Sequence, residues 1–358
     1  MQLGENRFKL GIFAANADGG LTLTTVPERW RADWLDIVAT AQMADRAGIE
    51  FFLPIARWKG YGGETDARGL SYETLTHGAA LAALTERIAI FSTVHVPLVH
   101  PVFAAKAIST IDHVSSGRAG LNIVCGWNQP EFDMFGVTAV ADRYAQGREW
   151  HEIFARTLTE TEPFDFDGRY YTCRRVESAP GMVGSGLPLI MSAAFSPPGR
   201  DFAAHTSQYL LTTMTDIDEG RRDITDIEAR AAALGRSLGV MATAHVVVRE
   251  TKDEADAFYH RYSVELADHA AVDNHMRMKK AMANSHDPRA FDLYRQRFAG
   301  GTGTYPLIGT PDMVVAEMVR MHEAGYAGTT VSFCNFRTEL PYFIEQMLPR
   351  LRDAGLRG

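Results

Sequence analysis

Short apolar runs alternate with amphipathic segments along the whole chain. The runs have the length of strands and are rich in β-branched and aromatic residues, so they predict eight buried strands. These strands are Phe8–Ala14, Phe51–Ala56, Ile88–Val94, Ala119–Val124, Leu187–Ala194, Tyr209–Met214, Val240–Val248 and Thr329–Phe333. Continuous apolar runs, as opposed to strict alternation, are typical of parallel sheets that are covered on both faces.

The segments between the runs carry apolar residues at helical spacing. The first predicted helix, Arg31–Ala47, stops before Gly48, the residue type expected just past a helix end. Further helices are predicted at Tyr72–Ala83, Val102–Ile111, Arg143–Leu158, Ile217–Leu234, Lys252–Leu266 and Leu340–Leu351. This alternation predicts an α/β fold, a single (β/α)8 TIM barrel over residues 1–358 whose active site lies at the C-terminal ends of the strands.

Two segments interrupt the alternation and predict insertions after the fourth and seventh strands. Within residues 163–180, the pattern around Asp167-Gly168 predicts a hairpin that turns at this dipeptide. Residues 268–309 are polar and long for a connection, which is typical of a lid over an active site.

Composition and charge narrow the class of protein. Hydrophobic residues make up 46% of the chain and charged residues 22%, as in an ordinary globular protein. The net charge of -8 argues against binding to nucleic acid or to an anionic membrane. Three widely spaced cysteines, no secretion signal and no apolar run of spanning length predict a cytoplasmic protein.

Polar residues at the ends of the predicted strands are the first candidates for chemistry. Thr93 is near the end of the third strand, and Asn122 is inside the fourth. A buried amide needs partners, which a ligand or the neighbouring backbone could supply. Arg57 ends the second strand, where a guanidinium could hold an anionic ligand or form a surface ion pair.

Two predicted helix starts are candidates for binding a phosphate. Arg143-Tyr144 opens one helix, and Ser196 precedes Pro197 at the start of another. Free backbone N–H groups at helix starts attract anions, although Ser196 could equally be a simple N-cap. The histidine spacings do not match metal-binding motifs, so no metal site is expected.

One phrase of the sequence carries a family resemblance. It runs from Thr110 to Trp127, as TIDHVSSGRAGLNIVCGW, and continues through Pro130–Phe132, Asp142–Tyr144 and Leu307–Pro311. This pattern resembles the bacterial luciferase-like family of flavin-dependent monooxygenases over nearly the whole chain. Within that family the chain is most similar to the pyrimidine monooxygenases and the dimethyl sulfone monooxygenases.

The resemblance implies reduced FMN and dioxygen as cofactor and co-substrate. It assigns FMN contacts by position to Ala56 (through its backbone), Arg57, Asn122, Glu131, Arg143, Tyr144 and Ser196. Thr93 and Asn122 would lie where dioxygen meets the flavin. Arg57 replaces a lysine of the pyrimidine enzymes, which keeps the charge but changes its geometry.

His95 departs from the pyrimidine enzymes, which have a small residue at this position. Strand alternation puts it on the same side as Thr93, so we expect it to face the substrate pocket or to pack against the barrel rim. In the pocket it would donate a hydrogen bond or carry a proton near neutral pH.

The activity implied is two-component oxygenation of a small molecule, with cleavage of a C–N bond in a heterocyclic amide or oxygenation of a C–S bond in a sulfone or sulfonate. The resemblance also implies a transient NAD(P)H:flavin reductase partner, and we expect a homodimer or homotetramer. Two alternatives of other classes are hydride transfer with the deazaflavin F420 and a flavin-binding barrel without catalysis.

Overall fold

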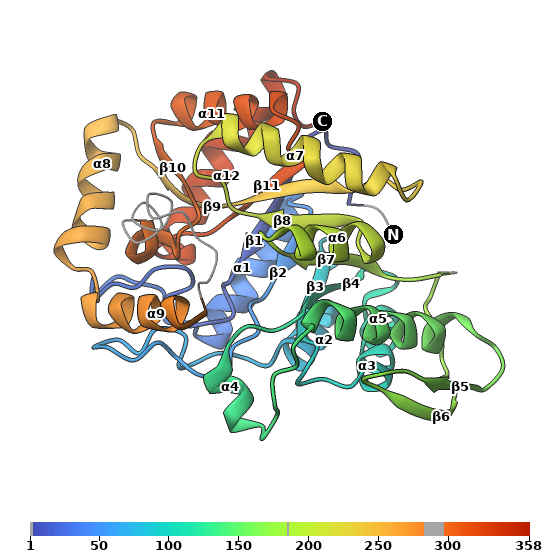
Figure 1. Ribbon diagram of the computed structural model, residues 1–358. Coiled ribbons are helices and arrows are strands. Elements are labelled where there is room, and N and C mark those ends of the chain that lie inside the picture. The colour runs from blue at the N-terminus through green and yellow to red at the C-terminus, as the bar shows by residue number, and fades with distance from the viewer. Residues whose placement is uncertain (1–2, 185, 283–296) are drawn as a thin grey trace.

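The computed structural model describes residues 3–184, 186–282 and 297–358, and it contains a closed barrel of eight parallel strands (Figure 1). The barrel strands are β1 (Lys9–Phe13), β2 (Phe51–Leu53), β3 (Ala89–His95), β4 (Ala119–Val124), β7 (Leu189–Ala193), β8 (Tyr209–Thr212), β9 (Gly239–Val248) and β11 (Gly328–Val331). Each pairs with the next in this order, and β11 pairs back with β1. The predicted TIM barrel is therefore confirmed.

Helices surround the strands on the outside of the barrel (Figure 1). They are α1 (Trp34–Ala47), α2 (Thr74–Leu84), α3 (Pro101–Ser115), α5 (Arg143–Thr159), α6 (Pro197–Thr206), α7 (Ile217–Ala232), α11 (Pro311–Glu323) and α12 (Phe336–Asp353). The C-terminal end of α1 follows the predicted signal, whereas its start lies three residues after the predicted Arg31. Asp33 caps its first turn, and Gly48 ends it in the left-handed conformation with φ 77°.

The lower part of the barrel interior is filled by apolar side chains. Phe51, Phe91, Met191 and Met241 are fully buried and belong to one cluster there. Gly120 makes room for the Phe91 ring, because a Cβ on this glycine would approach that ring to 2.5 Å. The interior is thus a packed core and not a channel.

The insertion after β4 holds a short helix, α4 (Gln129–Met134), and a hairpin of β5 (Phe164–Asp167) and β6 (Thr172–Val176). Asp167 is the last residue of β5 and pairs with Thr172, while the backbone N–H of Gly168 donates to the carbonyl of Tyr171 at 2.9 Å. The chain therefore reverses over residues 168–171, slightly later than the predicted Asp167-Gly168 turn.

The segment after β9 begins with α8 (Lys252–His260), a π-helical turn (Arg261–Glu265) and α9 (His269–Met282). The predicted helix Lys252–Leu266 is thus helical almost throughout, but its last turn is widened. Residues 283–296, part of the predicted lid, lie outside the described residues. The last five residues of that segment form β10 (Tyr305–Gly309), which pairs with the second half of β9.

In the three described ranges, we find no helix that is both long enough and apolar enough to cross a membrane.

Candidate functional site

Thr93 and Asn122 lie opposite each other on β3 and β4, at the level where the apolar core of the barrel ends. The Thr93 hydroxyl donates to the carbonyl of Pro54 at 2.6 Å, and Asn122 Nδ2 donates to Thr93 Oγ1 at 3.2 Å. Because the single hydroxyl proton is used by Pro54, the Asn122 amide must present its NH2 group to Thr93. Asn122 Oδ1 is buried and has no partner within the described part of the chain.

A buried ion pair joins the second strand end to α4. Glu131 is completely buried, and its Oε1 accepts from Arg57 Nη1 at 3.3 Å and from the backbone N–H of Trp58 at 3.0 Å. The Arg57 side chain is 7% exposed. The ion-pair alternative for Arg57 therefore holds, but the pair lies inside the barrel mouth and not on the surface.

His95 completes this network, with its Nδ1 at 3.7 Å from Glu131 Oε2. Burial lowers the pKa of His95 to about 4, although the Glu131 charge opposes this shift and the Arg57 charge adds to it. The ring is therefore neutral at pH 7. It suits a hydrogen-bond donor and not the proton carrier near neutral pH that the sequence allowed.

Several buried polar atoms around this network have no hydrogen-bond partner within the described part of the chain. They are Arg57 Nε, His95 Nδ1, Asn122 Oδ1, Asn128 Oδ1 and Glu131 Oε2. Leaving such groups unpaired costs free energy, so a group of them at one strand-end region indicates a polar ligand. The edge of a flavin ring carries both hydrogen-bond donors and acceptors, and these match the acceptors and donors of this set.

Arg143, Tyr144 and Ser196 meet at the starts of α5 and α6, as predicted for a phosphate site. Arg143 Nη2 lies 3.2 Å from the Tyr144 hydroxyl, which lies 3.2 Å from Ser196 Oγ. Ser196 occupies the N-cap of α6, but its side chain makes no capping hydrogen bond. Gly199 permits the approach of Tyr144, since a Cβ there would be 2.7 Å from the hydroxyl. A guanidinium and two hydroxyls at a helix start fit a phosphate monoester.

Ala56 comes directly before Arg57, just past β2, and is partly exposed. Its backbone therefore lies at the same strand end as the ion pair.

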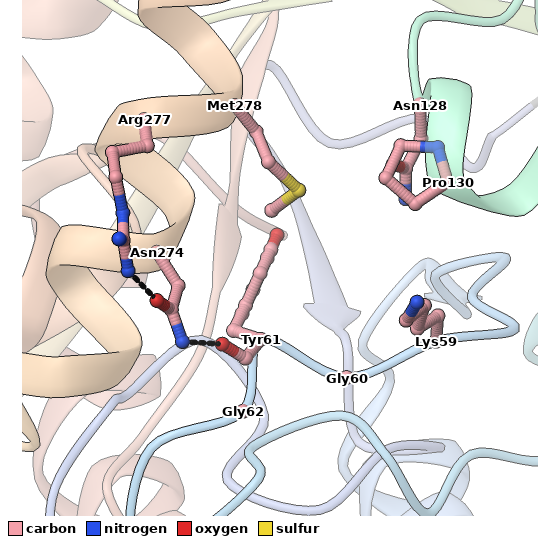
Figure 2. Close-up of a pocket in the computed structure, with 9 residues that line it drawn as sticks. All are labelled: Lys59, Gly60, Tyr61, Gly62, Asn128, Pro130, Asn274, Arg277 and Met278. Atoms are coloured by element: carbon pink, nitrogen blue, oxygen red, sulfur yellow. Dashed lines mark hydrogen bonds between the residues drawn. The ribbon is translucent and has the colours of Figure 1, made fainter.

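A cavity of about 380 Å³ opens beside these groups (Figure 2). It is lined by residues 59–62 of the β2–α2 loop, by Asn128 and Pro130 at the start of α4, and by Asn274, Arg277 and Met278 of α9. Asn128 is 3% exposed and belongs both to the cavity wall and to the set of unpaired polar groups. His95, Thr93 and Asn122 are not part of the wall.

Glycines let the β2–α2 loop pack directly on α9. Gly62 has φ 65°, and a Cβ there would be 2.9 Å from Asn274 Nδ2. Asn274 Nδ2 donates to the Tyr61 carbonyl at 2.8 Å, and Asp268 accepts from the backbone N–H of Thr65 at 2.7 Å. The β2–α2 loop and α9 are therefore packed directly against each other.

Sequence reasoning missed the aromatic residues around Arg57. Its guanidinium lies 5.0 Å from the ring centroid of Trp127 and 5.4 Å from that of Tyr61. The Tyr61 hydroxyl accepts from Arg57 and from Arg68, at 3.1 and 2.9 Å. His275 of α9 packs on Tyr61 with 4.9 Å between ring centroids. The glycines around Tyr61 are typical of a flexible loop near the barrel mouth, but nothing in the sequence indicated its contact with Arg57.

His245 on β9 was also missed. Its Nδ1 lies 2.9 Å from Thr304 Oγ1, and burial lowers the pKa of His245 to about 3. A signal was available, because His245 is two residues beyond Thr243 and four beyond the core residue Met241, on the same face of the strand.

Across the described ranges, no group of three or more His, Cys, Asp or Glu side chains is arranged to hold a metal ion.

Comparison with known proteins places this geometry in context. Residues 8–328 match the family described as "Luciferase-like monooxygenase". The chain is 27% identical to the FMNH2-dependent dimethylsulfone monooxygenase of Pseudomonas fluorescens (strain Pf0-1), over 99% of this chain and 98% of that protein. It is 26% identical to pyrimidine monooxygenase RutA of Bradyrhizobium sp. (strain BTAi1 / ATCC BAA-1182), over 97% and 98%.

The fold is similar to that of riboflavin lyase (RcaE), solved with modified FMN and riboflavin. The TM-score is 0.85 at 22% identity, and the match covers 98% of this chain and 93% of that one. At this level of identity the likeness supports the barrel fold alone.

Proposed function

The chain belongs to the luciferase-like monooxygenase family, and from that premise we propose that it is the oxygenase of a two-component system that uses reduced FMN and dioxygen. The family match confirms the recognition made from the sequence and the prediction of a flavin-dependent monooxygenase. The observation that carries the proposal is the row of unpaired polar atoms on Arg57, Asn122 and Glu131, next to a phosphate-type cluster.

The residues that would hold the cofactor divide into two groups. Arg143, Tyr144 and Ser196 would bind the phosphate. The backbone of Ala56 and the side chains of Arg57, Asn122 and Glu131 would line the ring and give their unpaired atoms partners. When bound, reduced FMN supplies the electrons that dioxygen needs to react with an organic molecule.

Thr93 and Asn122 would position dioxygen. Thr93 is held by its bond to Pro54, so it orients Asn122, whose second amide hydrogen and Oδ1 remain free to act in the site. Such fixed dipoles cost no reorganisation during the reaction. Their burial also keeps water from the reacting atoms.

We further propose that the described part of α9, with the β2–α2 loop, acts as the lid predicted for residues 268–309. Its residue His275 is buried and packs on Tyr61, close to Arg57. A cover of this kind would retain the ring and exclude solvent.

The substrate would be a small organic molecule oxygenated beside the ring. The main candidate reaction is cleavage of a C–N bond in a heterocyclic amide, in line with the relatives named as pyrimidine monooxygenases. The second is oxygenation of a C–S bond in a sulfone or sulfonate, in line with those named as dimethylsulfone monooxygenases.

A reductase that supplies reduced FMN would be a transient partner. We also propose a cytoplasmic location and a homodimer or homotetramer. The three cysteines are all unpaired, as is usual in a reducing compartment. Size-exclusion chromatography with light scattering would test the oligomeric state.

The cofactor is tested by titrating the apoprotein anaerobically with reduced FMN and with reduced FAD. FMN should bind more tightly, because the Arg143–Tyr144–Ser196 cluster suits a terminal phosphate. Equal or tighter binding of FAD would contradict the phosphate assignment.

The activity is tested by turnover with a flavin reductase in 18O-labelled dioxygen, across heterocyclic amides, sulfones and sulfonates. One labelled oxygen atom in the product is expected. A protein that binds FMN but labels none of these compounds would be a flavin-binding barrel. Tight binding of F420 instead would indicate hydride transfer.

His95 is tested by His95→Ala, assayed separately for flavin affinity and for turnover. A large loss of turnover with normal flavin affinity would place His95 at the substrate. Unchanged turnover would return it to a packing role at the barrel rim.

A further inference from the structure

The cavity beside the candidate flavin site has a positively charged wall. Lys59 comes from the β2–α2 loop and Arg277 from α9, on either side of Tyr61 and Met278 (Figure 2). Among the described residues that line the cavity, none is an aspartate or a glutamate. This is unexpected in a chain whose net charge is -8.

Two carboxylates of the loop and of the α9 start are engaged by other groups. Asp66 accepts from the backbone N–H of Gly62 at 2.8 Å, and Asp268 accepts from Thr65 and from the backbone N–H of Ala271 at 3.0 Å. Both carboxylates are therefore directed into the loop and the start of α9. In the described ranges, no carboxylate forms an ion pair with Lys59 or Arg277.

Arg277 is instead held by an uncharged acceptor. Its Nη2 donates to Asn274 Oδ1, and Asn274 is itself tied to the Tyr61 carbonyl (Figure 2). This bond leaves most of the donors of the guanidinium for another partner. Lys59 and Arg277 are exposed cations that line the same cavity, and neither has an ion-pair partner within the described ranges, which suits them to bind an oxyanion.

A second polar group lies in the same wall. Asn128 is 3% exposed, and its Oδ1 has no hydrogen-bond partner in the described part of the chain. A buried amide oxygen without a partner is stabilised by a ligand that donates a hydrogen bond to it, for example from a ring N–H. The flat and apolar sides of Tyr61, Pro130 and Met278 complete the wall.

We propose that this cavity binds an anionic group of the substrate, a carboxylate or a sulfonate, through Lys59 and Arg277. The inference rests on the proposed oxygenase function and names the charge of the molecule that this site admits. Asn128 favours a heterocyclic amide that carries a carboxylate, because such a ring offers a donor and an anion together. A sulfonate is the alternative source of the same charge.

The test compares neutral and anionic molecules of similar shape. Binding to the anaerobic complex with reduced FMN is measured by calorimetry for uracil against uracil-6-carboxylate, and for dimethyl sulfone against methanesulfonate. The anion should bind roughly tenfold or more tightly than its neutral counterpart in at least one pair, and its affinity should fall as salt is added. The pair that responds identifies the carboxylate or the sulfonate.

Lys59→Met and Arg277→Met should each weaken anion binding by about fivefold, the upper range for an exposed ion pair, and leave the neutral compound unaffected. Lys59→Arg and Arg277→Lys should retain most of the affinity. Arg222→Met, on an exposed position of α7, is the matched control and should change nothing.

Neutral compounds that bind as well as the anions in both pairs would overturn the proposal, as would anion binding that both methionine variants leave unchanged. These failures differ from failure of the proposed function. Reduced FMN is titrated first without any substrate, so a protein that binds FMN but not anions refutes only the anion site.

Discussion

Along β3, Ala89 and Phe91 point into the apolar core of the barrel, whereas Thr93 and His95, the next residues on the same face, lie among polar groups. The same strand and the same two-residue alternation therefore build two different environments. Below Thr93, Ala89 and Phe91 belong to one cluster of buried apolar side chains. Above it, several buried polar atoms lack partners. The packed lower part provides the stability that allows the upper part to keep unsatisfied groups for a ligand.

Removing a side chain from the lower part should have the largest effect. Phe91 packs edge-on against Phe51 with 5.8 Å between ring centroids. Phe91→Ala should reduce the free energy of unfolding by about 3–5 kcal/mol, because it leaves a cavity in the packed core. Chemical denaturation measures this. A loss below about 1 kcal/mol would show that the two parts of the interior do not differ in packing.

Asn122→Ala should impair the reaction strongly and the stability of the fold only weakly, the reverse of Phe91→Ala. We expect product formation per reduced flavin consumed to fall by about a hundredfold or more, because the loss of a fixed donor raises the barrier by roughly 3–4 kcal/mol. Hydrogen peroxide should appear instead of product, and the free energy of unfolding should change much less than in Phe91→Ala. Product and peroxide are measured together in one assay, and retained coupling would refute the assignment of Asn122.

Arg143→Met should weaken binding of reduced FMN by roughly 1.5–3 kcal/mol, the range for a hydrogen bond to a charged group. Reduced riboflavin has no phosphate and is the matched control. Its affinity should be the same for the variant and the original protein. An equal loss for both flavins would mean that Arg143 acts on the ring or on the fold.

The pH dependence of stability should also differ between the two parts. Burial lowers the pKa of His95 in the folded protein from 6.5 to about 4. The unfolded state therefore binds the proton first, so the stability from the neutral ring is fully present above pH 6.5 and is lost as the pH falls toward 4.

His95→Gln should accordingly flatten the decline in stability between pH 6.5 and 4 by up to about 1.4 kcal/mol per pH unit. Denaturation curves at several pH values measure this slope. Identical slopes in both proteins would mean that the pKa of His95 is the same in the folded and unfolded states.

The barrel could be predicted from the sequence because the apolar runs and the helix signals along the chain agree with the fold. Each barrel strand overlaps a predicted apolar run, and α1 ends before the predicted Gly48, although it begins three residues after the predicted start. Two elements had weaker signals. β10 contains Pro306 and ends at Gly309, which is tolerated because β10 pairs only with β9 at the edge of the sheet. Thr310 and Pro311 are typical of a helix start, but α11 was not predicted, because the polar segment before it interrupts the alternation of strands and helices.

The candidate site was less predictable because its contacts depend on tertiary structure. Residues Arg143, Tyr144 and Ser196 could be expected at helix starts, and the structure brings them together. The pairing of Arg57 with Glu131 spans 74 positions and exists only once β2 and α4 meet. No periodic pattern carries information about such a contact.

The cover of the cavity depends on contacts that are distant in sequence. Thr65 meets Asp268 across 203 positions, and Tyr61 meets Asn274 across 213. During synthesis, at about 5–20 residues per second, α9 would emerge several seconds after Ser196, the last residue of the phosphate cluster. β11, which joins β9 to β1 and closes the barrel, follows later still. The edges of β9 and β1 that β11 covers therefore stay unpaired until β11 has emerged, the period in which the nascent chain is most exposed to association with other chains.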